Sequence, residues 1–521
     1  MSISVDDPKL GKLVTLIKDS FRVRPNHDPI YVDLAGNIDR VASKQHQVIF
    51  GRRGSGKSCL LVHFHRQVAS EKDIFSIYVD ADEIKMLGFP DVLIRLVLDI
   101  TEKVSEPSGN FFKRISSRRP REAKQQIKEL RQLLDMAEES RVTEQSGFEE
   151  QAKGGFKLDG PAASVTGDFG STESRGTTSV FTAKKLDALQ RHLPDYKRVV
   201  VDCLERSNSP SGAVIVDDFY LFHQSVQPDI VDYLHRLLRG TNFYLKIGTV
   251  RHRTRLLRHE GQAIGVELAQ DVEEISLDRT FEDVEATQSY LDLMLDSLAQ
   301  SVGINSASEF ISPDGLLHLA LASGGVPRDY LTTLVEAVEA ARASGRDRVT
   351  PSAVYKGASR VSYRTKLKQL RDDVAGDADA IEGVLLDLVE FCLKEESKTG
   401  FLVSQDEVTT HEAEHEVIQQ LMDFKLIHII ESDTSAASGR TGRFEAYTLD
   451  FALFMEPRRR GINIVEFWKI DDQRRRIGVR EAPAYSLDRV ATAKLKPSTK
   501  TEQKISAIQE QFEAETAEPG V

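Results

Sequence analysis

The sequence predicts an α/β fold, in which helices cover a parallel β-sheet, followed by a helical domain and a small C-terminal domain. Short apolar runs of strand type occur at 47–50, 75–80, 213–216 and 243–249. Stretches with helical spacing of apolar residues lie between them, and this alternation is typical of a parallel sheet. The length of 521 residues corresponds to about three domains.

The composition excludes several classes of protein. A hydrophobic content of 40% is too high for a wholly disordered chain. The formal charge of -12 excludes a uniformly basic protein that coats nucleic acid. Cys59, Cys203 and Cys392 lie far apart without a CxxC pair, which argues against a disulfide framework. The sequence has neither a signal peptide nor an apolar stretch of the roughly 20 residues that a membrane span needs, so we expect a cytoplasmic protein with no membrane partner.

The most specific motif lies at residues 51–58, which read GRRGSGKS. It matches the phosphate-binding pattern GxxxxGK[ST] and lies between a strand-type run and an apolar helix. Glycines let backbone N–H groups turn inward to form a nest for an anion, and the helix N-terminus adds partial positive charge. Lys57 is expected to contact the outer phosphates, and the Ser58 hydroxyl to ligate Mg²⁺. The predicted nucleotide-contacting residues are Gly51, Arg52, Arg53, Gly54, Ser55, Gly56, Lys57, Ser58 and Cys59.

An acidic pair is expected at the end of a buried strand. Residues 213–216 are apolar, and Asp217 and Asp218 follow them directly. Beside a phosphate-binding loop, Asp217 is placed to hold magnesium together with Ser58, and Asp218 to polarise an attacking water. The alternative is an ordinary strand end that closes in an Asx turn.

Two further motifs carry arginines. The strand at 243–249 ends in Thr249, and Arg251 opens a cationic run to Arg258 that is either a solvated face or an arginine finger for a neighbouring subunit. Residues 324–329 read GGVPRD between two helix-like stretches. Pro327 suits the first turn of a helix, and Arg328 on that turn could reach back to the phosphates.

Taken together, these motifs resemble those of AAA+-type ATPases, and more narrowly of the origin-recognition-like branch and the STAND ATPases. The resemblance covers residues 25 to 350 and implies a P-loop NTPase with an additional strand, in the order 5-1-4-3-2, and a helical lid. It implies that Thr249 and Arg251 form the first sensor of the terminal phosphate and that Arg328 forms the second. It also implies that Pro327 is among the nucleotide-binding residues and that ATP and Mg²⁺ are bound. Residues 29–32 would lie where such families hold adenine. AAA+ enzymes usually have Glu at the position of Asp218, so slow hydrolysis, suited to a switch, is expected.

The domain boundaries follow from composition. We predict the ATPase core at 1–280, with an insertion at 105–180, and the lid at 281–370. Within the insertion, residues 110–131 hold eight basic and two acidic residues, and 147–176 have linker composition with a hairpin as the alternative at 164–169. The composition of the insertion supports two hypotheses: it is a mobile segment, or it is a basic arm that touches DNA or a partner.

In the C-terminal part we predict a winged helix at 378–455, an extension at 456–490 and a disordered tail at 491–521. Two helical stripes precede two strand-type runs, at 426–430 and 444–449, which is the winged-helix pattern. Residues 401–424 have six acids and no Lys or Arg, whereas a helix that reads DNA is normally basic. We therefore prefer a protein-contacting or autoinhibitory domain. The Arg-rich segment 458–476 around Trp468 predicts either nucleic-acid binding or an edge strand at 462–470.

These features lead to three functional hypotheses. The first is an ATP-hydrolysing switch that controls DNA or a protein partner, with a homo-oligomer as one form of partner. The second is a nucleotide-gated, initiator-like DNA-binding protein with incidental hydrolysis, and the third a scaffold that holds ADP. The HExxH match at 411–415 has a charged residue at an intervening position and no evident third ligand, which favours a solvated helix over a zinc protease.

Overall fold

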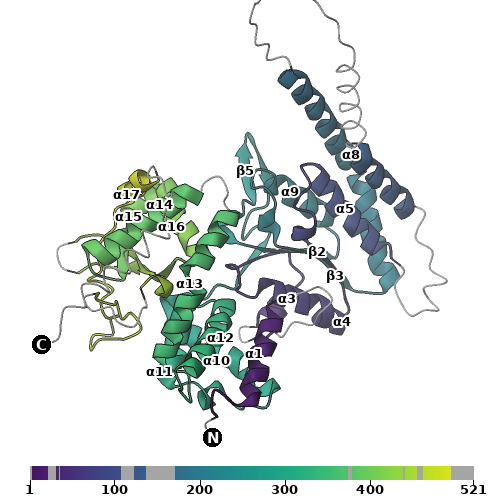
Figure 1. Ribbon diagram of the computed structural model, residues 1–521. Coiled ribbons are helices and arrows are strands. Elements are labelled where there is room, and N and C mark those ends of the chain that lie inside the picture. Colours follow the sequence, from purple (N-terminus) through teal and green to yellow (C-terminus); the bar gives the residue numbers. More distant parts are fainter. Residues whose placement is uncertain are drawn as a thin grey trace, which may run out of the picture.

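The structure is a computed structural model, which describes residues 3–21, 31–33, 36–106, 122–136, 170–373, 378–437, 440–454 and 462–494. The sheet and its helices are called the core, the helices at 281–373 the lid, and residues from 378 onward the C-terminal domain. In Figure 1 the long lid helix α13 (Pro351–Asp373) lies between the C-terminal domain and the core.

Five parallel strands build the core in the order β2-β3-β4-β1-β7. They are β1 (Gln47–Phe50), β2 (Ile74–Asp80), β3 (Ser211–Asp217), β4 (Phe243–Thr249) and β7 (Glu273–Ser276). Read from β7, this is the predicted order 5-1-4-3-2. Phe50 pairs with Thr249 in register, and Asp80 pairs with Asp217, so the carboxyl ends of the strands share one edge. Ligands of open parallel sheets bind at that edge.

Helices cover both faces of this sheet because successive side chains of a strand point to opposite sides. Val48 and Phe50 pack toward α5 (Asp91–Val104), α8 (Gly170–Ser207) and α9 (Gln227–Leu238). Ile49 packs toward α2 (Asn37–Val41) and α3 (Lys57–His63). Helix α3 continues through η1 (Phe64–Val68) into α4 (Ala69–Glu71). Short 3-10 turns follow three of the strands, namely η2 (Ala81–Glu83), η3 (Phe219–Leu221) and η4 (Arg251–Arg253).

The predicted insertion at 105–180 contributes the helix at 122–136 and the first residues of α8. Residues 122–136 form a helix whose Ala123, Ile127 and Leu130 are buried, and α8 extends away from the sheet (Figure 1). Helix α8 begins at Gly170, within the segment 147–176 to which we assigned linker composition. The alternative hairpin at 164–169 and the basic residues up to 121 lie outside the described residues.

A small hairpin, β5 (Leu257–Glu260) and β6 (Gln262–Gly265), follows η4 and was not predicted. It carries part of the cationic run, and Arg258 forms an ion pair with Asp229 of α9 at 2.9 Å.

The lid consists of helices packed on one another, and it includes a segment that we assigned to the core. Its elements are η5 (Phe281–Asp283), α10 (Val284–Ser301), η6 (Ala307–Glu309), α11 (Pro313–Ala322), α12 (Pro327–Ala343) and α13. Helix α1 (Pro8–Ser20) buries Leu10, Leu13 and Ile17 among these helices, so the predicted boundary of 1–280 does not hold for it. Its backbone is tied there as well, since the Val5 N–H donates to the Asp347 carbonyl at 3.0 Å.

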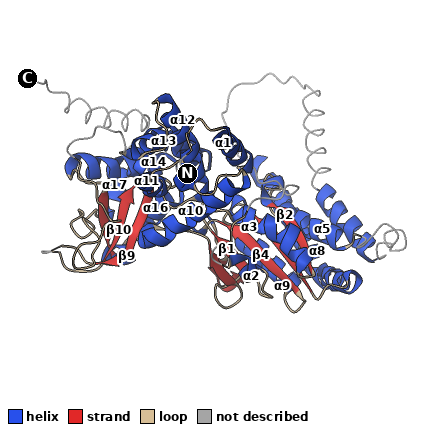
Figure 2. Ribbon diagram, turned by 90° about the horizontal axis from the view of Figure 1, so that it is seen from below, coloured by secondary structure: helices blue, strands red, loops and turns tan. Residues whose placement is uncertain are grey.

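The C-terminal domain has a three-stranded antiparallel sheet in the order β8-β10-β9. Its elements are α14 (Ala378–Val389), η7 (Glu390–Glu395), β8 (Gly400–Ser404), α15 (Gln405–Thr410), α16 (Glu412–Asp423), β9 (Ile427–Thr434), β10 (Phe444–Leu449), η8 (Phe451–Leu453) and α17 (Leu487–Ala493). Strand β8 and helix α15 were not predicted. Figure 2 shows this sheet apart from that of the core, with α10 and α16 between them.

The extension beyond η8 does not form the predicted edge strand at 462–470. It makes only isolated bridges there, such as that of Asn463 with Lys398. The Phe467 ring is buried 5.1 Å from Phe281 of the lid, and Trp468 packs 6.1 Å from Phe451. These rings fill the junction of the lid and the C-terminal domain, which leaves Phe467 closed to stacking with bases. Helix α17 runs to Ala493, into the predicted tail, and residues 495–521 lie outside the described part. None of the helices in the described ranges has both the length and the apolar character that crossing a bilayer requires.

Candidate nucleotide site

The glycines of the loop at 51–56 are required by its geometry. Gly54 and Gly56 have φ angles of +93° and +97°, which side-chain-bearing residues rarely adopt. A Cβ atom on Gly51 would lie 2.3 Å from the Ser55 Oγ, so only glycine fits there. The Gly51 N–H donates to the Thr249 carbonyl at 3.2 Å, which joins the loop to the end of β4.

Lys57, the first residue of α3, lies inside the curve of this loop. Its side chain is buried, and its Nζ donates to the Gly51 carbonyl at 2.6 Å. Burial lowers the pKa of Lys57, while the nearby charges of Asp218 and Asp217 act to raise it. The structure thus brings the predicted lysine and the predicted acidic pair together.

Asp217 is almost fully buried, and both of its carboxylate oxygens have protein donors. The Tyr78 hydroxyl donates to Oδ2 at 2.7 Å, and the Asp218 N–H donates to Oδ1 at 2.9 Å. Sequence reasoning missed Tyr78, since it appears only as one residue of an apolar run. Its role depends on the pairing of β2 with β3, which no local pattern reveals.

Asp218 has an unusual backbone and an unusual charge environment. Its φ of 53° places it in the left-handed region. Burial and the neighbouring Asp217 raise the pKa of Asp218 to about 7, and Lys57 opposes the shift. A carboxyl group with a pKa near neutrality is suited to accept a proton during a reaction.

The predicted first sensor is engaged by the core itself. The Thr249 hydroxyl is buried and shares a hydrogen bond with Thr254. Arg251 forms an ion pair with Glu274 of β7, and its guanidinium lies 4.2 Å from the Phe50 ring centroid. Thr249 therefore meets the loop through its backbone, and a sensor role for these two side chains stays a prediction.

The lid motif touches the loop directly. The Arg328 N–H donates to the Gly54 carbonyl at 3.2 Å, and a Cβ on Gly54 would lie 2.9 Å from the Arg328 Cβ. Pro327 occupies the first turn of α12, as expected. The exposed Arg328 side chain also donates to the Phe21 carbonyl at 3.3 Å. The N-terminus of α12 thus borders the loop at 51–56.

Arg52 differs from its predicted role as a nucleotide contact. Its side chain is only 5% exposed and donates to the carbonyls of Arg279 and Gly324, at 2.6 and 3.1 Å. Its backbone N–H and its Nε donate to Asp278, at 2.7 and 3.3 Å. The Arg52 side chain thus ties the loop to the lid, whereas the neighbouring Arg53 is exposed.

The predicted adenine segment is partly described. The Tyr31 ring lies 6.0 Å from that of His63 on α3, and Asp33 caps α2 by accepting from two backbone N–H groups at 2.9 Å. Residues 29 and 30 lie outside the described part.

The residues of the loop fit a magnesium nucleotide. The Oγ of Ser55, within the loop, is buried without a hydrogen-bond partner among the described residues. The Ser58 hydroxyl and the Asp217 carboxylate supply oxygen, which Mg²⁺ prefers. The described residues contain no group of three or more His, Cys, Asp and Glu arranged for a metal.

The C-terminal domain contacts both the lid and the core beside this site, and these contacts were not predicted. Lys425 forms a buried ion pair with Asp329 of α12 at 2.9 Å. His428 packs so closely on Gly324 that a Cβ there would lie 2.0 Å from its Cε1. Helix α16 packs on η4. Asp423 is the last residue of α16, and burial together with the nearby Asp278 raises the pKa of Asp423 to about 7. Lys425, His428 and Asp423 are called the interdomain cluster.

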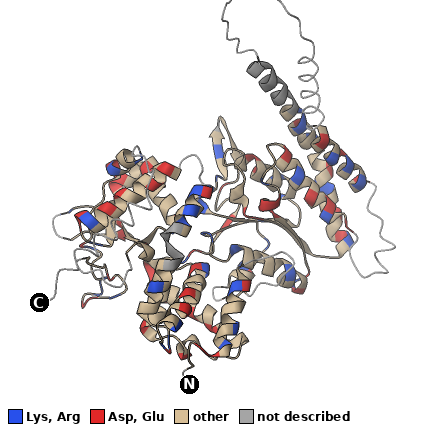
Figure 3. Cartoon of the chain, in the orientation of Figure 1, with Lys and Arg blue, Asp and Glu red and all other residues tan. Residues whose placement is uncertain are grey.

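The structure adds little support for the predicted nucleic-acid contacts of the C-terminal part. Figure 3 shows Asp and Glu along the helices of the C-terminal domain. Arg476 donates to the carbonyls of Phe281 and Ile430, each at 2.7 Å, so it holds the extension on the protein. In the HExxH match, the His415 Nε2 bonds Glu445 of β10 at 2.8 Å, and the His415 side chain is only 15% exposed, so this histidine does not lie on the solvated helix face that we predicted. Residues 455–461 lie outside the described ranges.

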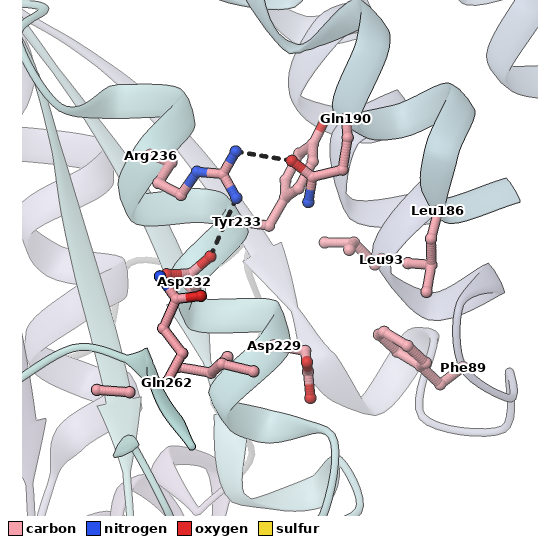
Figure 4. A pocket seen from close by; sticks show the side chains of 11 residues that line it. Phe89, Leu93, Leu186, Gln190, Asp229, Asp232, Tyr233, Arg236 and Gln262 are labelled. Carbon is pink, nitrogen blue, oxygen red and sulfur yellow. Dashed lines mark hydrogen bonds and ion pairs between the residues drawn. The ribbon is translucent and has the colours of Figure 1, made fainter. Parts of the chain in front are cut away.

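A separate pocket lies between α5, α8, α9 and β6 (Figure 4). Arg236 bridges it by hydrogen bonds to Asp232 and Gln190, at 3.3 and 2.7 Å. A third charged residue of its lining, Asp229, is paired with Arg258 of β5 at 2.9 Å, and the pocket holds none of the predicted site residues.

Comparisons with known proteins identify distant structural neighbours. Neither models of protein families nor curated proteins match this sequence. Among solved structures, the ORC2 protein of Aeropyrum pernix in its ADPNP-ADP complexes is 13% identical with a TM-score of 0.41, and the match covers 95% of this chain and 98% of that one. The Aeropyrum pernix ORC1 protein in complex with DNA is 13% identical with a TM-score of 0.32, and the match covers 85% and 88%. A Thermotoga maritima RuvB mutant is 10% identical with a TM-score of 0.29, and the match covers 65% and 73%.

Proposed function

We propose that this chain is an AAA+-type ATPase of the origin-recognition-like kind, which binds ATP with Mg²⁺ between core and lid and works as a conformational switch. The observation that carries the proposal is the meeting of three motifs at one place. Lys57 lies within the loop, the Asp217–Asp218 pair lies beside it, and the α12 N-terminus is hydrogen-bonded to the Gly54 carbonyl.

In this proposal the inward N–H groups of the loop and Lys57 hold the outer phosphates of ATP. Ser58 and Asp217 would hold Mg²⁺, which when bound offsets the negative charge of the phosphates. Asp218 accepts a proton from a water whose oxygen bonds to the terminal phosphorus. The bond to the bridging oxygen breaks, and ADP and phosphate result. The pKa of about 7 of Asp218 suits this acceptance near neutral pH.

The output of the switch is the position of the C-terminal domain. We propose that this domain is a winged helix, because α14, β8, α15, α16, β9 and β10 follow in the order helix, strand, two helices, two strands, and β10 pairs between β8 and β9. The interdomain cluster joins it to α12 and to the loop before that helix, so a movement of the lid on ATP binding strains these contacts. The acidic α16 lies against η4, which favours a protein partner over DNA as its target.

Hydrogen exchange with the nucleotide-free, ADP-bound and ATP-bound protein tests this proposal. Amides of α16 and η4 should exchange faster with ATP than with ADP, because the contact between them loosens. The Lys57→Ala variant serves as the control and should exchange equally in all three conditions. If ATP turnover is normal while α16 and η4 exchange identically in every state, the C-terminal domain is not the output of this site.

A further inference from the structure

We infer that Tyr78 is a positioning residue for the magnesium site, which acts by fixing the carboxylate of Asp217. This inference rests on the proposed function, because it concerns the same nucleotide site. The observation is the hydrogen bond of 2.7 Å from the Tyr78 hydroxyl to the Asp217 Oδ2.

The Asp217 carboxylate is held on three sides. Oδ2 accepts from Tyr78, and Oδ1 accepts from the Asp218 N–H at 2.9 Å. Gly248 of β4 lies close to the group, since a Cβ atom there would lie 2.6 Å from Oδ1. The group therefore has one orientation, and one lone pair on each oxygen remains for a further contact.

Tyr78 is itself fixed by its surroundings. It belongs to β2 and is 8% exposed, its ring lies 5.8 Å from that of His65, and its carbonyl accepts from Lys103. A side chain locked in this way spends no further conformational entropy when it orients its neighbour. Residues that orient a metal ligand change metal affinity by about 10-fold to 100-fold when they are removed.

Replacing Tyr78 by Phe removes only the hydroxyl. Tyr233 provides a matched control, because it is also buried in the core and its hydroxyl makes one hydrogen bond, to the Leu189 carbonyl at 2.8 Å. Each variant is made in the full chain, and its thermal unfolding is compared with that of the wild type.

The test is binding of a fluorescent, non-hydrolysable ATP analogue with Mg²⁺ and with EDTA. Tyr78→Phe should raise the Mg²⁺ concentration for half-maximal binding by about 10-fold and leave affinity in EDTA unchanged. Tyr233→Phe should alter neither value. Equal Mg²⁺ dependence in Tyr78→Phe and wild type, or an equal shift in both variants, overturns the inference. A wild-type chain that binds no analogue under either condition overturns the proposed function as well, so the two failures are distinguishable.

Discussion

The Nζ of Lys425 lies 2.9 and 3.0 Å from the two carboxylate oxygens of Asp329, which joins the C-terminal domain to the first turn of α12. Lys425 is 6% exposed and Asp329 is 14% exposed, so water screens this pair little. One residue before Asp329, the Arg328 N–H donates to the Gly54 carbonyl of the loop at 51–56. The two contacts place one turn of one helix between the proposed nucleotide site and the C-terminal domain.

Breaking this ion pair should destabilise the protein strongly. Lys425→Met leaves the Asp329 charge buried without its partner, and we expect the free energy of unfolding to fall by about 3 kcal/mol. The double variant with Asp329→Asn should lose less than the sum of the two single losses. Denaturant unfolding of the full chain measures the values. The exposed pair Arg191–Asp187 serves as the comparison, and Arg191→Met should cost less than about 1 kcal/mol. Equal losses at the two pairs would contradict the burial argument.

Gly324→Ala should open the contact between the lid and the C-terminal domain. Gly324 and Gly345 both have positive φ angles, of 61° and 58°, so alanine adds backbone strain of about 1 kcal/mol at each. Only at Gly324 would the new Cβ meet another side chain, His428 at 2.0 Å, whereas the site at Gly345 is open. We therefore expect Gly324→Ala to speed hydrogen exchange of β9 and to destabilise more than Gly345→Ala. Identical behaviour of the two variants would show that the His428 contact is unimportant.

The Asp218 carboxyl should make the stability of the nucleotide-free protein depend on pH. Its pKa is raised from 3.8 to about 7, so the folded state binds a proton that the unfolded state releases. The stabilisation that Asp218 contributes is fully present below the pKa of its carboxyl in the unfolded chain. This contribution, at most about 4 kcal/mol, is lost as pH rises from about 4 to about 7. Asp218→Asn should lose less stability over this range in EDTA. Asp423 titrates in the same direction, so part of the loss remains in that variant. A pH profile unchanged by Asp218→Asn would contradict this assignment.

Much of the core could be predicted because its signals are local. The loop at 51–58 and the run ending in Asp217 specify strand, turn and helix within a few residues, and the order of the strands agrees with the resemblance. The same reasoning failed where tertiary packing decides. Helix α1 has an ordinary amphipathic pattern, which cannot indicate that it packs on the lid and not on the sheet.

Side-chain roles were less predictable than elements. Arg52 lies inside the motif, yet its side chain contacts Asp278 and the loop before α12. This could not be predicted, because neither partner is near Arg52 in the sequence. Tyr78 and Lys425 carry no motif, and their importance follows only from strand pairing and from the contact between domains.

The most direct test of the central claim is steady-state ATP turnover of Lys57→Ala beside the wild type, with folding checked by thermal unfolding. Lys57 is the buried cation of the loop, so its loss should lower turnover by about 100-fold or more and weaken binding of ATP. Turnover by a folded Lys57→Ala variant equal to that of the wild type would contradict the assignment of residues 51–58 as the nucleotide site.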